Sequence, residues 1–291
     1  MTAGSIDVRY LRSHPLPTHQ AADKHGRGRV LVVGGSVDVP GATSLAGLGV
    51  LRAGAGVLRI ATCQINAPHI ASIIPEAMVV GLRENPAGEI AAENSSRLID
   101  LASTCDAILI GPGMLHEPSV EQVCSILMSQ VDGPPFVLDA AAFTVLRSIE
   151  LPKNKWERIV CTPHAGEMAK YLEKDREDVE KDPLAAAREA SARLGAVIAM
   201  KGASTFVVAP AGEALLNEHG SIGLATSGSG DTLAGILAGL LARGASPFVA
   251  TAWAVYLHAE AGRRIADRIG RLGLLAREIP DEIPRIMMEM E

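Results

Sequence analysis

The sequence predicts an α/β protein with a three-layer α/β/α fold around a mainly parallel central sheet. Short apolar runs recur along the first half of the chain, and segments with helical spacing separate them. Each run is apolar at consecutive positions, which is typical of a strand buried on both faces. Most runs end at glycine or at a polar residue, as expected where strands lead into loops. Together these observations predict parallel strands joined by helices that cover both faces of the sheet.

The first strand of this sheet is expected at residues 30–33. This compact apolar run is followed by Gly34 and Gly35, which favours a buried strand and then a tight turn. Residues 41–54 combine helical spacing with many small side chains and are predicted to form a closely packed helix. By the same criteria, further strands are expected at 57–61, 77–80, 107–110, 136–138 and 158–161, and further helices at 89–102 and 119–128.

The second half of the chain has a different pattern. A charged stretch at residues 175–194 is predicted to be helical. Three short β-type runs follow with only the turn sequences Gly-Ala-Ser and Pro-Ala-Gly between them, which predicts an antiparallel meander. The meander strands are expected at 196–201, 205–209 and 213–216, and the helices after them at 230–242, 247–269 and 277–288.

The chain is predicted to contain one domain. No Pro/Gly/Ser-rich linker and no internal repeat divides it. A length of 291 residues is within the range of a single α/β unit. We therefore expect an N-terminal extension at residues 1–23 and a single domain at residues 24–291.

Composition argues against several kinds of partner. The 27 basic and 33 acidic residues give a net charge of −6 and no basic stripe, so nucleic acid is not an expected partner. Aromatic residues make up only 3% of the chain, which argues against a stacking platform for bases. No apolar run reaches the length of a membrane span, and the N-terminus lacks a signal peptide, so we expect no membrane partner and a cytoplasmic location. The four scattered cysteines are interpreted as small buried side chains, not as disulfides or a zinc site.

Four of the predicted strands end in residues that suit a binding site. The strand ends carry Gly34-Gly35-Ser36, Gly111-Pro112-Gly113, Asp139 and Thr162-Pro163-His164. In open α/β sheets, ligands bind beyond the carboxyl ends of the strands, and glycine lets a ligand approach the backbone. We therefore expect these four segments to share one edge of the sheet and to border a crevice.

The run from Thr226 to Asp231, Thr-Ser-Gly-Ser-Gly-Asp, is the strongest candidate for chemistry. It leads directly into a long helix of Leu, Ala, Gly and Ile. A helix start presents unpaired N–H groups and the positive end of the helix dipole to an anion. Asp231 has two interpretations, a helix cap or a base that takes a proton from a hydroxyl while the helix start holds a phosphate. The accompanying glycines favour the second interpretation.

Two other segments carry polar residues with two interpretations each. Lys201, in Lys-Gly-Ala-Ser-Thr, is either a surface lysine beside a hairpin turn or a phosphate contact with the turn backbone beneath the nucleotide. His164 is either a buried, hydrogen-bonded histidine or a side chain that faces the ligand, and Glu167 suits the first turn of a helix. The chain has no Walker A, His-Glu-x-x-His or dinucleotide fingerprint sequence, so a Rossmann dehydrogenase is disfavoured.

From about Lys24 to about Pro280, the chain resembles the ADP/ATP-dependent NAD(P)H-hydrate dehydratases of the ribokinase-like superfamily. The Gly-Ser-Gly-Asp sequence alone would indicate only the superfamily, but eight motifs in the same order make the resemblance specific. These motifs are Lys24-His-Gly-Arg-Gly with Val30-Leu-Val-Val-Gly-Gly-Ser36, Pro40-Gly-Ala42 with Leu51-Arg-Ala-Gly-Ala-Gly56, Pro75-Glu76-Ala-Met, Gly111-Pro-Gly113, Val137-Leu-Asp139-Ala, Thr162-Pro-His164-Ala-Gly-Glu167, Lys201-Gly-Ala-Ser-Thr205 and Ala225–Asp231.

The resemblance implies a lyase that repairs hydrated NADH and NADPH. In this family the ring hydroxyl is phosphorylated from ADP or ATP and then leaves as phosphate, a much better leaving group than hydroxide. With ADP the products are NAD(P)H, AMP and phosphate. The family also implies Mg²⁺ with the nucleotide, although the sequence shows no dedicated acidic metal site, and it implies a homotetramer.

The resemblance also implies roles for individual residues. Asp231 is expected to act as the base and to contact the substrate. Contacts to the hydrated dinucleotide are expected from Ala42, Gly113 and His164. Contacts to ADP are expected from Lys201, Gly202, Ala203, Ser204, Thr205, Asn217 and Gly230.

The chain departs from the family pattern at two places. Residue 141 is alanine where the family usually has a second acid, and Ser221-Ile-Gly-Leu replaces a frequent Asn-Pro-Gly-Met. Many members also carry an N-terminal epimerase domain, which is not expected here. Two alternatives stay open: a ribokinase-like kinase of a vitamin precursor such as a hydroxyethylthiazole or hydroxymethylpyrimidine, and a non-catalytic nucleotide-binding homologue.

Overall fold

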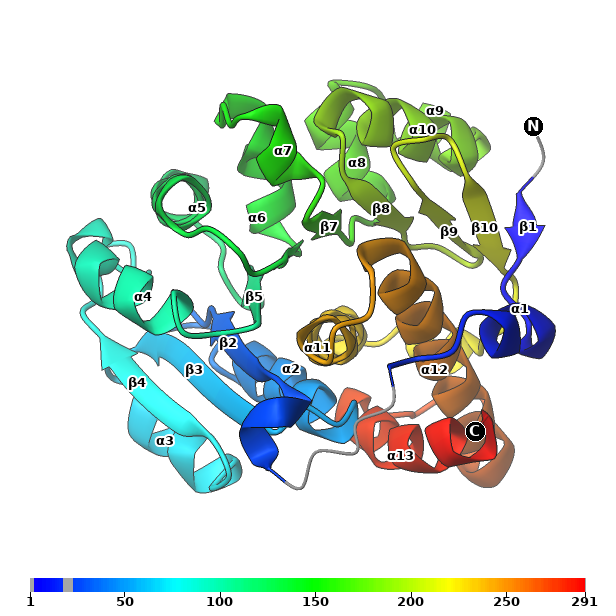
Figure 1. Cartoon of the computed structure of the whole chain (residues 1–291), viewed down its shortest axis with the longest axis horizontal. Coiled ribbons are helices and arrows are strands. Elements are labelled where there is room, and N and C mark those ends of the chain that lie inside the picture. The colour runs from blue at the N-terminus through cyan, green and yellow to red at the C-terminus, as the bar shows by residue number, and fades with distance from the viewer. Residues whose placement is uncertain (1–2, 18–22, 291) are drawn as a thin grey trace.

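A single mixed sheet organises the protein, whose computed structural model describes residues 3–17 and 23–290. The described strands form one 10-stranded sheet in the order β1-β10-β9-β8-β7-β6-β5-β2-β3-β4 (Figure 1). All neighbours from β8 to β4 in this order are parallel, and β9 is antiparallel to β8 and β10. The mainly parallel sheet and the meander are therefore confirmed. The strands are β1 Gly4–Ser5, β2 Arg29–Val33, β3 Val57–Cys63, β4 Met78–Leu82, β5 Ala107–Ile110, β6 Phe136–Leu138, β7 Ile159–Cys161, β8 Val197–Met200, β9 Thr205–Val208 and β10 Ala214–Asn217.

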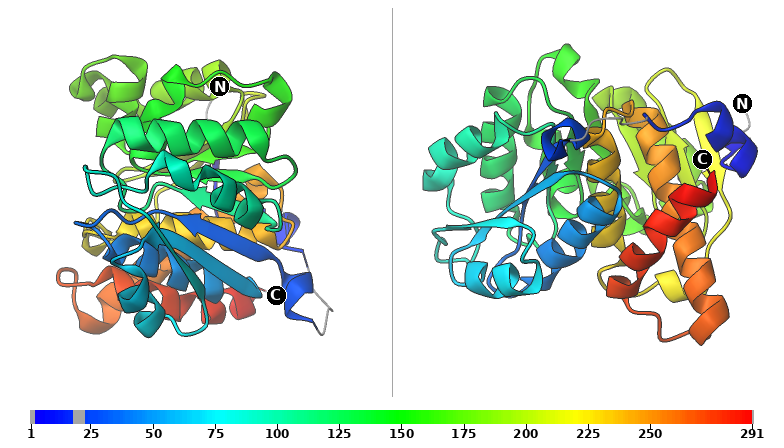
Figure 2. Two further views of the ribbon diagram at one scale, coloured as in Figure 1. Left: turned by 90° about the vertical axis from the view of Figure 1, so that its left-hand side faces the viewer. Right: turned by 60° about the horizontal axis from the view of Figure 1, so that its bottom comes forward.

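Helices cover both faces of the sheet, which confirms the three-layer α/β/α prediction (Figures 1 and 2). One face carries α4 Ser95–Ala102, α5 Glu117–Gln130, α6 Ala141–Thr144, α7 Lys153–Trp156, α8 Ala165–Leu172, α9 Arg176–Lys181 and α10 Pro183–Leu194. The other carries α1 Val8–Ser13, α2 Gly41–Arg52, α3 Ala67–Ile73, α11 Ser229–Ala242, α12 Pro247–Ile269 and α13 Ile279–Met290.

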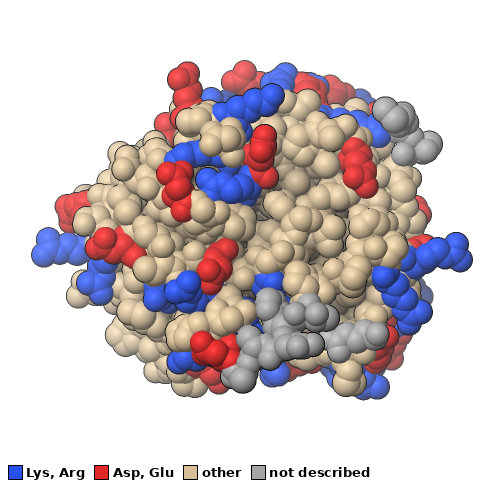
Figure 3. All heavy atoms as spheres, viewed as in Figure 1, with Lys and Arg blue, Asp and Glu red and all other residues tan. Residues whose placement is uncertain are grey.

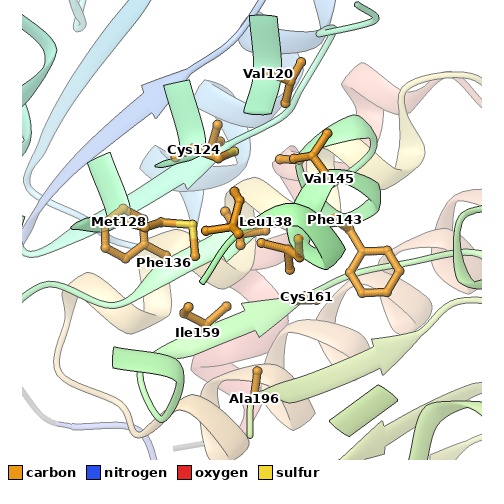
Figure 4. Close-up of a cluster of buried hydrophobic side chains, with 14 of the residues drawn as sticks. Val120, Cys124, Met128, Phe136, Leu138, Phe143, Val145, Ile159, Cys161 and Ala196 are labelled. Atoms are coloured by element: carbon orange, nitrogen blue, oxygen red, sulfur yellow. The ribbon is translucent and has the colours of Figure 1, made fainter. Parts of the chain in front are cut away.

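Two apolar clusters, one on each face, stabilise these layers. Alternate residues of β2 divide between them: Leu31 belongs to the first cluster and Val32 to the second, as the two-residue repeat of a strand requires. In the first cluster, Phe136 of β6 and Ile159 of β7 lie near Met128 of α5 (Figure 4). All four cysteines are buried and unpaired, as predicted.

Helices α2 and α11 pack with their backbones in close approach. A Cβ atom on Gly235 would lie 2.0 Å from the carbonyl oxygen of Ala46, and one on Gly239 would lie 2.8 Å from that of Val50. These pairs follow the same order in both helices, so the helices run in parallel and begin at the same end. The close packing therefore brings the first turns of α2 and α11 to one edge of the sheet.

Two of the predicted helices have wrong boundaries. The helix predicted at 89–102 begins only at Ser95, because Ile90 pairs with Glu84 in a β-bridge and the buried carboxylate of Glu89 accepts N–H bonds from the 115–116 backbone. The helix predicted at 175–194 is two helices. The break lies at Asp182, whose side chain caps α10, and Pro183 is the first residue of that helix.

The described part of the N-terminal extension packs on the rest of the domain. Strand β1 is hydrogen-bonded to β10, and Ile6 and Leu11 are fully buried. The indole N–H of Trp253 donates to the carbonyl oxygen of His14 at 2.8 Å. Residues 1–2 and 18–22 of the extension lie outside the described residues.

Charged side chains are mixed on the surface shown in Figure 3, where Lys and Arg lie interspersed with Asp and Glu. Within residues 3–17 and 23–290, no helix is both long enough and apolar enough to span a membrane.

Candidate active site

The four strand ends singled out in the sequence share one edge of the sheet. Strands β2, β5, β6 and β7 are consecutive parallel neighbours, so their carboxyl ends point the same way. Hydrogen bonds tie the ends together: the N–H of Gly35 donates to the Pro112 carbonyl oxygen at 2.8 Å, and the hydroxyl of Thr162 donates to Asp139 at 2.7 Å. The prediction that the four segments share one edge of the sheet is therefore confirmed.

Ala42 and Gly113 lie next to each other at this edge. A Cβ atom on Gly113 would lie 3.0 Å from the Cβ of Ala42 and 2.4 Å from the carbonyl oxygen of Val39. Gly113 also has a φ of +69°, a conformation that favours glycine. Only glycine fits here, and the backbone at Gly113 therefore stays accessible beside the start of α2.

The start of α11 has the backbone features of an anion-binding site. Gly228, at φ +87°, turns the chain into the helix that begins at Ser229. Among the described residues, the N–H groups of Gly230 and Asp231 have no acceptor. Free N–H groups and the helix dipole together favour a phosphate at this position.

The structure excludes the helix-cap interpretation of Asp231. The N-cap residue is Gly228, and Asp231 is the third residue of the helix, with no capping hydrogen bond. Burial raises the pKa of the Asp231 carboxyl to about 7, and the charge of Asp139 adds to this effect while the ammonium of Lys201 opposes it. A carboxyl group with a pKa near 7 is well matched to taking up a proton at neutral pH.

Lys201 is not a surface lysine of a hairpin turn. Its Nζ donates to Oδ1 of Asp139 at 2.8 Å, and the side chain of Asp139 is 4% exposed. Burial alone would lower the pKa of Lys201, but the charges of Asp139 and Glu167 outweigh burial and raise the pKa above its usual value. The side chain is therefore a cation. A Cβ atom on Gly230 would lie 3.2 Å from Nζ, which places the ammonium at the start of α11.

A cavity of about 780 Å³ lies beside the start of α11, within the size range of ligand sites. Part of its wall is apolar, formed by Leu224, Leu233, Val255 and Ala259. The predicted residues on the wall are His164, Lys201, Gly202, Ala203, Thr205, Asn217 and Gly230. Those outside the wall are Ala42, Gly113, Ser204 and Asp231.

His164 and Asn217 shape the loops around this cavity. His164 is not buried: its Nδ1 accepts the N–H groups of Gly166 and Glu167 and caps α8, and its side chain is largely exposed. Asn217 is buried, and its side-chain amide bonds both the N–H and the carbonyl oxygen of His219. It therefore holds the turn that follows β10.

Two further residues line the cavity: Ser229, to which the sequence analysis gives no role of its own within the run from Thr226 to Asp231, and His258, which it does not identify. Nε2 of His258 lies 2.9 Å from Oγ of Ser229. A signal for His258 exists in the sequence: it follows Thr251 and Val255 on the buried stripe of α12, where a polar side chain is unusual.

The family model of the NAD(P)H-hydrate dehydratases matches residues 30–285 of this chain. The chain belongs to this family. It is 45% identical over 286 residues to the ADP-dependent (S)-NAD(P)H-hydrate dehydratase of Xanthomonas campestris, covering 97% of this chain and 96% of that enzyme. Against a bifunctional NAD(P)H-hydrate repair enzyme of Moorella thermoacetica, it is 34% identical and spans about half, 52%, of the relative's length.

The structure of the chain is also similar to a solved structure of this family. The ADP/ATP-dependent NAD(P)H-hydrate dehydratase from Bacillus subtilis, co-crystallised with ATP and Mg²⁺, superimposes on the chain with a TM-score of 0.87. The two chains are 32% identical, and the superposition covers 100% of each. The fold is therefore ribokinase-like, as the resemblance implied.

Proposed function

We propose that this chain is an ADP-dependent (S)-NAD(P)H-hydrate dehydratase, which restores NADH and NADPH from their hydrates. The observation that carries the proposal is Asp231, whose pKa is about 7 and which lies at the start of α11 beside a ligand-sized cavity. Similarity to an ADP-dependent enzyme over nearly the full length of both chains supports the choice of reaction and donor.

In the proposed reaction, Asp231 takes the proton of the ring hydroxyl. The hydroxyl oxygen attacks the terminal phosphorus of ADP, and AMP leaves. The N–H groups of Gly230 and Asp231 and the ammonium of Lys201 stabilise the charge on the phosphoryl group during transfer. The lone pair of the ring nitrogen then expels phosphate as the C–O bond breaks, and a proton leaves the neighbouring ring carbon. The products are NAD(P)H, AMP and phosphate.

We propose that two ligands, the hydrated dinucleotide and the nucleotide donor, meet at the start of α11. We assign the hydrated ring and its dinucleotide to Ala42, Gly113, His164 and Asp231, and the nucleotide donor to Lys201, Gly202, Ala203, Ser204, Thr205, Asn217 and Gly230. Asp231 lies where the first turns of α2 and α11 meet, and this position supports a role between the two ligands. Most of the residues assigned to the donor line the 780 Å³ cavity, and its apolar wall suits the adenine ring.

Magnesium fits this site as an ion carried in with the nucleotide. Within the described part of the chain, no group of three or more His, Cys, Asp or Glu residues could hold a metal ion. The carboxylate of Asp139 is bonded to Lys201 and Thr162, and that of Glu167 to the backbone of His164. Phosphate oxygens and water are the ligands that Mg²⁺ keeps in such sites, where it neutralises phosphate charge.

We also propose that the protein acts in the cytoplasm as a homotetramer. The small-residue faces of α2 and α11 are in contact with each other, so they are not available for contacts between chains. An interface would therefore use other surfaces. Sedimentation velocity of the purified protein measures the oligomeric state directly.

A direct assay tests the proposed function. Hydrated NADH is mixed with enzyme, ADP and Mg²⁺, and the absorbance of the reduced nicotinamide is followed. We expect the absorbance to return, with one AMP and one phosphate formed for each NADH. No return with either ADP or ATP would refute the proposal, and a stable phosphorylated vitamin precursor in a parallel reaction would indicate a kinase instead.

A further inference from the structure

His258 and Ser229 form a contact at the cavity wall that the proposed chemistry leaves unused. Nε2 of His258 lies 2.9 Å from Oγ of Ser229 and 3.0 Å from its carbonyl oxygen. His258 belongs to α12, and Ser229 is the first residue of α11 and is 4% exposed. The contact therefore joins α12 to the helix start at which the nucleotide phosphates are proposed to bind.

The geometry selects one tautomer of the histidine. A carbonyl oxygen only accepts hydrogen bonds, so its contact with Nε2 at 3.0 Å requires a hydrogen on Nε2. Burial lowers the pKa of His258 to about 4, so at neutral pH the ring is neutral and this is its single N–H. The same N–H faces Oγ of Ser229, and that oxygen is therefore an acceptor toward the histidine.

The hydroxyl hydrogen of Ser229 is consequently directed away from His258. Among the described residues, this hydroxyl has no other hydrogen-bond partner. It lies on the cavity wall next to the free N–H groups of Gly230 and Asp231. A third donor at a helix start favours an anionic acceptor such as phosphate.

We propose that the Ser229 hydroxyl binds a phosphate oxygen of the nucleotide, and that His258, through its Nε2–H, is the positioning residue that holds the hydroxyl in this orientation. This inference rests on the proposed function only in requiring that the cavity takes a phosphorylated nucleotide. It adds a side-chain donor to the backbone N–H groups at the start of α11.

Calorimetric binding of ADP, compared with adenosine as a probe without phosphates, tests the role of Ser229. We expect Ser229→Ala to weaken ADP binding about tenfold, the worth of one hydrogen bond to a charged group. Adenosine binding should be unchanged, because adenosine has no phosphate. Equal weakening of both probes, or wild-type affinity for ADP, would overturn the assignment.

A double-mutant comparison tests the role of His258. We expect His258→Leu to weaken ADP binding by a similar factor and to add little in the Ser229→Ala background, because both changes act through one hydroxyl. His258→Gln should recover most of the affinity, since its amide presents an N–H close to the position of Nε2. Losses that multiply in the double variant would show that His258 does not act through Ser229.

Ser191→Ala is the matched control for removing a buried serine hydroxyl. Ser191 is 1% exposed, and its hydroxyl donates to the Ala196 carbonyl oxygen at 2.7 Å in the layer on the opposite face of the sheet. The control should lower thermal stability and leave ADP binding unchanged. Failure of the wild type to bind ADP would overturn the inference, whereas ADP binding through Ser229 without turnover of hydrated NADH would refute the proposed function alone.

Discussion

Replacing Asp231 by asparagine removes a group whose proton is held more tightly in the folded chain than in the unfolded chain. Burial, then Asp139, raise the pKa of Asp231 from 3.8 to about 7, and Lys201 only partly opposes the shift. The sign of the pH dependence follows from this direction. The stability contributed by the protonated carboxyl is fully present below about pH 4 and is lost as the pH rises through about 7.

The size of the effect follows from the shift. About three pKa units, at about 1.4 kcal/mol each, correspond to about 4 kcal/mol of stability lost at high pH. Of this, about 2–3 kcal/mol is lost between about pH 5 and pH 8. Asparagine has a similar shape and does not ionise. The free energy of unfolding of Asp231→Asn relative to the wild type should therefore rise by about 2–3 kcal/mol over that interval.

Urea unfolding at the two pH values, without nucleotide, measures this difference. In the hydrate assay the same variant should lose about 10²- to 10⁴-fold in kcat, the usual worth of a general base, while its affinity for ADP stays within a few-fold. Asp100→Asn, at an exposed position of α4, is the control and should change neither quantity. A stability difference that is constant with pH, or a turnover rate near that of the wild type, would refute the reasoning.

Three further substitutions test the packing and the charges around the site by urea unfolding at pH 7. Gly235→Ala should cost on the order of 3 kcal/mol, because the new Cβ would lie 2.0 Å from the Ala46 carbonyl oxygen; an unchanged midpoint would contradict the close helix packing. Ala140→Gly should stabilise by about 1 kcal/mol, because Ala140 has a φ of 51° and ψ of −130°; destabilisation would argue against strain. Lys201→Met should cost about 3 kcal/mol by leaving buried Asp139 without its cation, and a neutral effect would show that the pair is dispensable for folding.

The layers of this fold are predictable from the sequence because its strands are apolar at consecutive positions. The segments whose structure depends on distant partners were predicted less well. Strand β1 has only two residues and exists through its pairing with β10, so no local pattern marks it. The start of α4 was misplaced because Glu89, a good helix former in isolation, is buried as an acceptor for backbone groups more than twenty residues later.

The candidate site likewise has features that local sequence predicts and features that depend on distant partners. Glycines and polar residues at strand ends are local signals, and they correctly predict that these segments share one edge of the sheet. The ion pair of Lys201 and Asp139 joins residues 62 positions apart. The sequence alone therefore leaves two interpretations of Lys201 open, a surface lysine beside a turn and a phosphate contact. The contact of Ser229 with His258 is likewise set by how α12 packs beside α11, which periodicity alone does not determine.

If the start of α11 binds the proposed nucleotide, the charges around Asp231 predict a need for positive charge from outside the chain. The ammonium of Lys201 contacts this group of residues, and Asp139 already shares it. Glu167 and Asp231 add two further carboxyl groups, and a nucleotide brings several phosphate charges to the same place. The N–H groups of Gly230 and Asp231 carry only partial charges, roughly half an elementary charge for a whole helix start. Without an ion that arrives with the phosphates, their negative charge would raise the pKa of Asp231 further and keep the base protonated. We therefore expect a metal requirement to come from this electrostatic balance and not from a protein-bound metal site.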